Sequence, residues 1–202
     1  MIYLLERQVG FGDNEGIGFP SIKGCLAVVY QTTTGIFGFH NAGNSGADKF
    51  ALRSKKWRDW VIQHPNGNDP GVALYGVSFI RRNLRGYPGT KSPVVFWKEE
   101  LKHFAHQLNF SGPIFGSDLA GIFTEPREVS ALVEFRKEGR GYGIFVREWY
   151  DNGQDGVTKD TWASSANFTH LDSKAEHMPK EMVKTVDQSG MIRAYPERLG
   201  GL

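Results

Sequence analysis

The sequence predicts an α+β fold in which mixed β-sheets form a sandwich-like core flanked by two or three helices. Six or seven segments rich in β-branched and aromatic residues are predicted strands, and two longer segments carry apolar residues at helical spacing. Because helices and strands do not alternate strictly, a purely parallel α/β sheet is not expected. No internal repeat or low-complexity linker divides the chain, so residues 1–202 are predicted to form one domain.

The N-terminal part is predicted to be strand-rich and to contain the hairpin on which the functional hypothesis depends. Residues 2–9 form a predicted strand, and the glycine-rich residues 10–20 form a predicted loop. Residues 21–43 then contain two runs of β-branched and aromatic residues, separated by the turn cluster at 32–35. This pattern is typical of two antiparallel strands joined by a tight connection.

The middle of the chain contains the two predicted helices. Residues 50–64 place Phe50, Trp57 and Val61 along one side, and a Pro-Asn-Gly cluster ends the helix. Residues 71–81 are a predicted buried strand. The second helix has Ser92 as its N-cap and Pro93 at its first position, followed by an apolar stripe to residue 108.

The C-terminal part has one clear hairpin and weaker patterns around it. Residues 112–123 are a predicted strand interrupted at 117–118, and residues 129–136 and 143–149 form the predicted hairpin. Periodicity weakens after residue 159. Residues 179–186 are a predicted short helix, and residues 196–202 a predicted loose tail.

Composition excludes several classes of function. The net charge of +2 gives no electrostatic case for binding nucleic acid or an anionic membrane, and no segment reaches the length of an apolar membrane helix. A single cysteine cannot form an internal disulfide, and residues 1–10 lack the pattern of a signal peptide. We therefore expect a monomer acting in a cytosol, with delivery into a target cell by a specialised secretion system as one route.

Cys25 and His40 are the residues most suited to chemistry. If the turn is centred between Thr32 and Thr33, Cys25 falls directly opposite His40 on one face of the hairpin. A thiol next to an imidazole is the arrangement of an activated cysteine nucleophile. A shift of two residues leaves the two as a diagonal pair on the same face, whereas a shift of one residue separates them. Ala27 and Gly38, both small, would let a substrate chain approach.

The residues Lys23-Gly24-Cys25, followed fifteen positions later by His40 at the end of the next strand, resemble the cysteine-histidine protein deamidases. This group includes the catalytic domain of cytotoxic necrotizing factor, the lethal-factor deamidases and the chemoreceptor deamidases of the CheD type. The resemblance covers this hairpin. Where some members carry a threonine six residues before the cysteine, this chain has Phe19. The resemblance implies a bacterial effector, toxin or housekeeping enzyme that modifies a target protein.

On this hypothesis Cys25 attacks the carboxamide of a protein glutamine or asparagine, and His40 accepts the thiol proton. Backbone N–H groups of Gly24 and Cys25 would stabilise the oxyanion. Ser21, Asn41 or Asn44, or equally a backbone carbonyl, would orient His40, and Ser21 is the residue chosen here. The substrate rim is predicted to include Gly16, Gly18, Asn41 and Asn44. No metal or other cofactor is required, and an amine in place of water would give transglutamination.

Two alternatives remain open at the level of the sequence. In a papain-like or cell-wall amidase hydrolase, Cys25 would work with a distant histidine such as His64 or His103, usually from the start of a helix. In a non-enzymatic binding module, Cys25 would be buried and inert. The His103 and His106 pair lacks further ligands at a zinc spacing and is not a predicted metal site.

Overall fold

The part of the chain that the structure describes contains two mixed sheets and two α-helices, which confirms the predicted α+β class. The computed structural model describes residues 1–13, 15–42, 47–79, 93–123, 130–149, 168–171 and 189–200. The five-stranded sheet has the order β1 (Ile2–Tyr3), β3 (Ile17–Ile22), β8 (Ser130–Glu138), β9 (Gly141–Trp149) and β11 (Ile192–Ala194). The seven-stranded sheet has the order β10 (Phe168–His170), β2 (Gln8–Gly12), β5 (Ile36–Asn41), β4 (Leu26–Thr32), β6 (Gly71–Ser78), β7 (Ile114–Asp118) and β12 (Glu197–Leu199).

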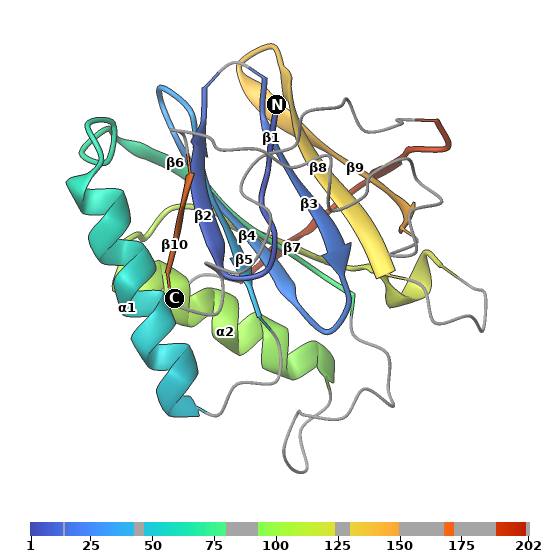
Figure 1. Ribbon diagram of the computed structural model, residues 1–202, viewed down its shortest axis with the longest axis horizontal. Helices are drawn as coiled ribbons and strands as arrows, with labels where there is room; N and C mark the ends of the chain where they lie inside the picture. The colour runs from blue at the N-terminus through green and yellow to red at the C-terminus, as the bar shows by residue number, and fades with distance from the viewer. Residues whose placement is uncertain are drawn as a thin grey trace.

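The elements form three layers, with the seven-stranded sheet in the middle (Figure 1). One of its faces packs against the five-stranded sheet, and the other is covered by α1 (Ala47–Gln63) and α2 (Pro93–Gln107). Alternation along each strand supplies both faces with apolar side chains, which explains the continuous burial of β4 and β5. The predicted sandwich with flanking helices is confirmed, and the predicted helix at 179–186 lies outside the described residues.

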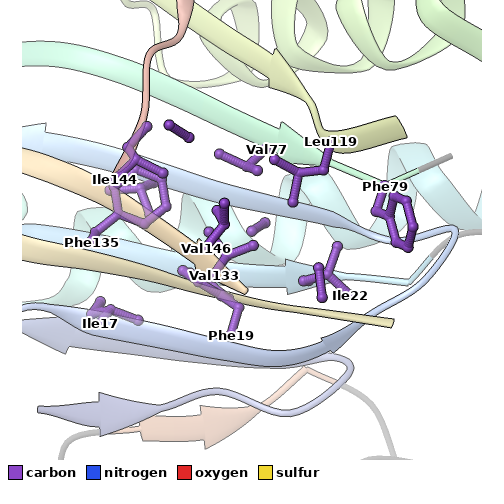
Figure 2. Close-up of a cluster of buried hydrophobic side chains, with 14 of the residues drawn as sticks. Ile17, Phe19, Ile22, Val77, Phe79, Leu119, Val133, Phe135, Ile144 and Val146 are labelled. Carbon is purple, nitrogen blue, oxygen red and sulfur yellow. The ribbon is translucent and has the colours of Figure 1, made fainter. Parts of the chain in front are cut away.

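The core between the two sheets is an apolar cluster that includes Cys25. Figure 2 shows other side chains of this cluster. Branched and aromatic side chains from β3, β8 and β9 meet the small side chains of Ala27 and Val29 on β4. Figure 2 shows Ile22 and Phe79 at one end of this core and Ile17 toward the other. The second core, on the helix side, is built from larger groups such as Phe39, Trp57 and Phe104.

The structure corrects several predicted boundaries at the N-terminus. The predicted strand over residues 2–9 is two strands, β1 and β2, because the chain reverses at Arg7, whose φ is 69°. The predicted loop over residues 10–20 contains the end of β2 and most of β3. These residues pair with Phe37 and Val133, so ladder hydrogen bonds override the high glycine content.

The C-terminal part also holds more strand than its pattern indicates. Residues 196–202 were expected to be a loose tail, yet β12 pairs antiparallel with β7 through Arg198 and Phe115. The strand predicted over residues 112–123 ends at Asp118, whose side chain accepts a hydrogen bond from the Ala120 N–H and begins a 3-10 turn. The predicted hairpin of β8 and β9 is present, paired from Ser130–Trp149 to Glu138–Gly141.

Candidate functional site

Cys25 lies in the connection between β3 and β4, at the end of the sandwich core that contains Ile22 and Phe79. The preceding residue, Gly24, has a φ of 69°, a conformation that glycine adopts without the strain of a Cβ. The N–H of Gly24 donates a hydrogen bond of 2.9 Å to the carbonyl of Phe79. This bond fixes the turn, so the cysteine is presented by a defined backbone and not by a loose loop.

The register of β4 and β5 decides how Cys25 and His40 are related. Ala27 pairs with His40 and Leu26 pairs with Asn41, so the next step of the ladder sets Cys25 across from Ala42. The predicted direct opposition of Cys25 and His40 is therefore wrong by two residues. The two residues form a diagonal pair on one face, and the Cβ atoms of such pairs are typically about 7 Å apart.

The turn explains the difference in register. Thr32 donates its N–H to the carbonyl of Gly35 at 2.9 Å, which centres the connection between Thr33 and Thr34. The Thr32 hydroxyl reinforces this closure through the same carbonyl at 3.3 Å. A shift of two residues keeps every side chain on its face, so Cys25 and His40 still share one face of the hairpin.

The ring of His40 is held in one tautomer by the backbone. Its Nδ1 lies 2.8 Å from the carbonyl oxygen of Leu4, which can only accept, so Nδ1 carries the proton. In the neutral ring, Nε2 is then the basic nitrogen. The ring of Phe19 meets the His40 ring edge-on at 6.2 Å between centroids. These contacts fix the plane of the imidazole, on the face of the hairpin that His40 shares with Cys25.

Both members of the pair are buried, and this changes how a substrate can reach them. Cys25 is 7 % exposed and His40 1 % exposed. The predicted approach over Ala27 and Gly38 is wrong, because Ala27 is fully buried and a Cβ on Gly38 would meet Leu4 and Phe19. The second sheet fills that space. The remaining exposure is at the end of the sheets, on Cys25 itself.

The structure changes the predicted roles of two supporting residues, Ser21 and Gly24. Ser21 lies where the pairing of β3 with β8 shifts register, with a φ of 61°. The hydrogen bond that orients His40 is donated by its Nδ1 to the carbonyl of Leu4. The role predicted for the Gly24 N–H as an oxyanion donor conflicts with its hydrogen bond to Phe79.

The predicted substrate rim is wrong for the three residues that can be placed. Gly16 precedes the far end of β3, about 20 Å along the strand from Ile22 at the usual rise per residue. Gly18 faces Tyr3 on the outer side of the five-stranded sheet. Asn41 lies two residues after Phe39 in the same strand, so both side chains face the helices, and Asn41 is 1 % exposed. Asn44 lies outside the described residues.

The distant histidines of the hydrolase alternative lie on the other side of the seven-stranded sheet. His64 contacts the rings of Phe37 and Trp60, and His103 lies 3.0 Å from the Ser54 hydroxyl between the two helices. Neither can reach Cys25 across the sheet. Cys25 also directly precedes a strand and not a helix, so the helix dipole of papain-like enzymes is absent there.

Ser54 and His103 form a serine-histidine contact that the sequence did not indicate. The Ser54 hydroxyl donates its only proton to the carbonyl of Ala51 at 2.9 Å, so it accepts from the His103 ring. Burial, followed by the neighbouring His106, lowers the pKa of His103. A serine whose proton is already directed to its own helix is a structural contact and not an activated nucleophile.

A buried charged contact ties the helices to the end of β5. Arg53 of α1 is 6 % exposed, and its Nη2 donates to the carbonyl of Ala42 at 3.4 Å. Burial raises the pKa of Glu100 on α2 from 4.5 to about 7, and the nearby Arg53 guanidinium opposes that rise. Sequence reasoning missed Arg53 and the carbonyl of Leu4, since a solvated basic run and a backbone oxygen give no pattern of their own.

Known proteins provide no family for the chain: no family model, curated protein or solved structure matches it. Within the described residues, no group of three or more histidine, cysteine, aspartate or glutamate side chains is arranged to hold a metal ion. In the same part of the chain, neither helix has the length and apolar character needed to cross a membrane.

Proposed function

We propose that this chain is a cysteine-dependent amidohydrolase that deamidates a glutamine, or an asparagine, of a target protein. The observation that carries the proposal is the placement of Cys25 and His40 on one face of a hairpin, with His40 Nδ1 bonded to the Leu4 carbonyl. That bond makes Nε2 the nitrogen able to accept the thiol proton. The resemblance of the Gly24-Cys25 turn to the deamidase group supports the same chemistry.

The burial of the pair favours a slender substrate group. Only 7 % of Cys25 is exposed, at the end of the sheets, and the space over Gly38 is filled by Leu4 and Phe19. A glutamine side chain is a narrow, unbranched arm that carries its carboxamide at the tip. A peptide bond in the main chain would have to bring two flanking segments to the same buried sulfur. Deamidation therefore fits this site better than proteolysis.

In the proposed reaction, the Cys25 thiolate attacks the carboxamide carbon after His40 Nε2 takes the thiol proton. The oxyanion of the tetrahedral intermediate is stabilised by the Cys25 N–H, because the Gly24 N–H is directed to Phe79. Protonated His40 gives its proton to the leaving nitrogen, which departs as ammonia. Water then adds to the thioester, the thiol leaves, and the side chain becomes a carboxylic acid.

Two measurements test this function. Alkylation of the native protein by iodoacetamide at neutral pH should modify Cys25, and His40→Ala should slow the reaction by at least about tenfold if the imidazole activates the sulfur. Ammonia release from casein, which presents many accessible glutamines, should be lost in Cys25→Ser. Ser21→Ala is the matched control for a nearby hydroxyl.

A second candidate, a non-enzymatic binding module, is favoured by one observation. Cys25 belongs to the apolar cluster between the sheets, where a free cysteine usually acts as a small hydrophobic residue. On that function the thiol would react only as the protein unfolds, at the same rate with or without His40. This outcome would replace the enzyme proposal with the binding module.

A further inference from the structure

The residues that follow His40 are tied to the helix layer by one buried cation. Arg53 comes from the helix-facing side of the molecule, and its Nη2 reaches the carbonyl of Ala42 at 3.4 Å. Ala42 lies across from Cys25 when the β4–β5 register is continued by one step. A side chain in α1 thus contacts the backbone directly opposite the nucleophile.

The opposite side of Arg53 faces the second helix. The guanidinium lies close enough to Glu100 to act on its pKa, while Glu100 itself is desolvated between the helices. Arg53 is 6 % exposed, and a buried guanidinium is retained only where several acceptors compensate its desolvation. The acceptor at Ala42 and the carboxyl on α2 therefore connect α1, α2 and the end of β5.

We infer that Arg53 is a positioning residue for the Cys25–His40 pair. It acts through the carbonyl of Ala42, holding the segment that carries His40 in the register that sets the imidazole diagonally from the sulfur. The two side chains of a diagonal pair are farther apart than those of an opposed pair. A small displacement of this segment therefore lengthens the path between Nε2 and the sulfur. This inference rests on the proposed function, because Arg53 is assigned the role of maintaining the geometry of the Cys25–His40 pair.

The test compares Arg53→Gln with Arg58→Gln, the same change on the same helix. Arg58 is partly exposed and paired with Asp59 at 2.6 Å, away from Ala42. Arg53→Gln should slow iodoacetamide modification of Cys25 about tenfold or more and lower kcat for ammonia release with KM little changed. Arg58→Gln should leave both within about twofold. Arg53→Lys keeps the charge and one donor, so it should recover part of the loss.

Hydrogen exchange separates this inference from the proposed function. The amides of residues 39–42 should exchange faster in Arg53→Gln than in Arg58→Gln, whether or not Cys25 is reactive. If the wild-type thiol is inert but exchange at 39–42 rises in Arg53→Gln, the deamidase proposal fails and the positioning contact stands. Where Arg53→Gln folds and leaves both exchange and alkylation at wild-type rates, the positioning role is overturned. Arg53→Lys supplies the comparison if Arg53→Gln does not fold.

Discussion

The two faces of the hairpin formed by β4 and β5 do different work, although they alternate along the same residues. The face toward the five-stranded sheet, the Cys25–His40 face, carries small side chains together with the two residues of the proposed site. The face toward the helices carries large rings, with Phe39 stacked on Trp57 at 6.0 Å and Phe104 edge-on at 5.9 Å. In the proposed function, adjacent residues along one strand therefore have different roles, one in catalysis and the next in packing against the helices.

The difference shows how a buried polar residue is accommodated in a sandwich core. His40 sits among apolar groups because the Leu4 carbonyl satisfies its Nδ1, and β1 and β2 bring that carbonyl alongside β5. On the helix face, the buried side-chain amide of Asn41 has no hydrogen-bond partner among the described residues. The polar contact that holds the His40 ring on the other face is made by a backbone carbonyl.

The largest expected effects come from mutating two neighbouring residues whose side chains point to opposite faces of the hairpin. His40→Ala should reduce deamidase kcat/KM by at least about a hundredfold, since general base catalysis is lost. Phe39→Ala should lower the free energy of unfolding by about 3–5 kcal/mol through loss of its ring contacts, while the molecules that remain folded keep most of their activity.

Urea unfolding together with steady-state kinetics checks this contrast. Phe39→Leu serves as a milder control that keeps an apolar side chain of similar volume at the helix face. An activity loss in folded Phe39→Leu as large as that in His40→Ala would show that the two faces are not functionally separate.

A second prediction concerns how tightly the side chains are packed on the Cys25–His40 face of the hairpin. A Cβ on Gly38 would lie 2.8 Å from Leu4 and 3.0 Å from both Ile17 and Phe19. Gly38→Ala should therefore cost about 1–3 kcal/mol in the free energy of unfolding through overpacking. Gly121→Ala is the control, because its Cβ would have no neighbour within 4 Å. Equal midpoints of chemical unfolding for the two variants would mean that the face has unfilled space.

Much of the layered fold was predictable because it depends on alternation. The apolar periods of β4, β5 and α2 identify which residues are buried, and a two-layer core with helices on one side follows from them. The short strands β1, β10, β11 and β12 were not predicted as such. They have two or three residues each, so their existence depends on a neighbour's unpaired edge and not on their own composition.

The candidate site was predictable in its residue types but not in its geometry. Sequence spacing joined Cys25 to His40, yet the register depends on which threonine closes the turn, and Thr32, Thr33 and Thr34 look alike in sequence. The partners of the site are backbone carbonyls of Leu4 and Phe79, from segments 36 and 55 residues away from the groups they bind. No side-chain pattern marks a carbonyl, so those contacts could only be seen in the folded chain.

The smallest effect is expected on the helix side, from the charge of Glu100. Its pKa is raised to about 7 in the folded protein, so the folded state keeps a proton that the unfolded chain loses near pH 4.5. Stability should therefore decrease as the pH rises from about 4.5 to about 7. Glu100→Gln imitates the protonated form, so it should match the wild type near pH 4.5 and exceed it above pH 7 by about 1 kcal/mol after allowance for solvent screening.

Urea unfolding of both proteins across this pH range measures the difference directly, and the other titrating groups cancel because they are common to both. Glu99→Gln, at the adjacent and more exposed position of α2, is the control for removing a carboxyl group from this helix. A pH-independent difference between Glu100→Gln and the wild type would show that the carboxyl is solvated in the folded protein. In that case Arg53 would still connect α1 to Ala42, but Glu100 would add no charged contact between the two helices.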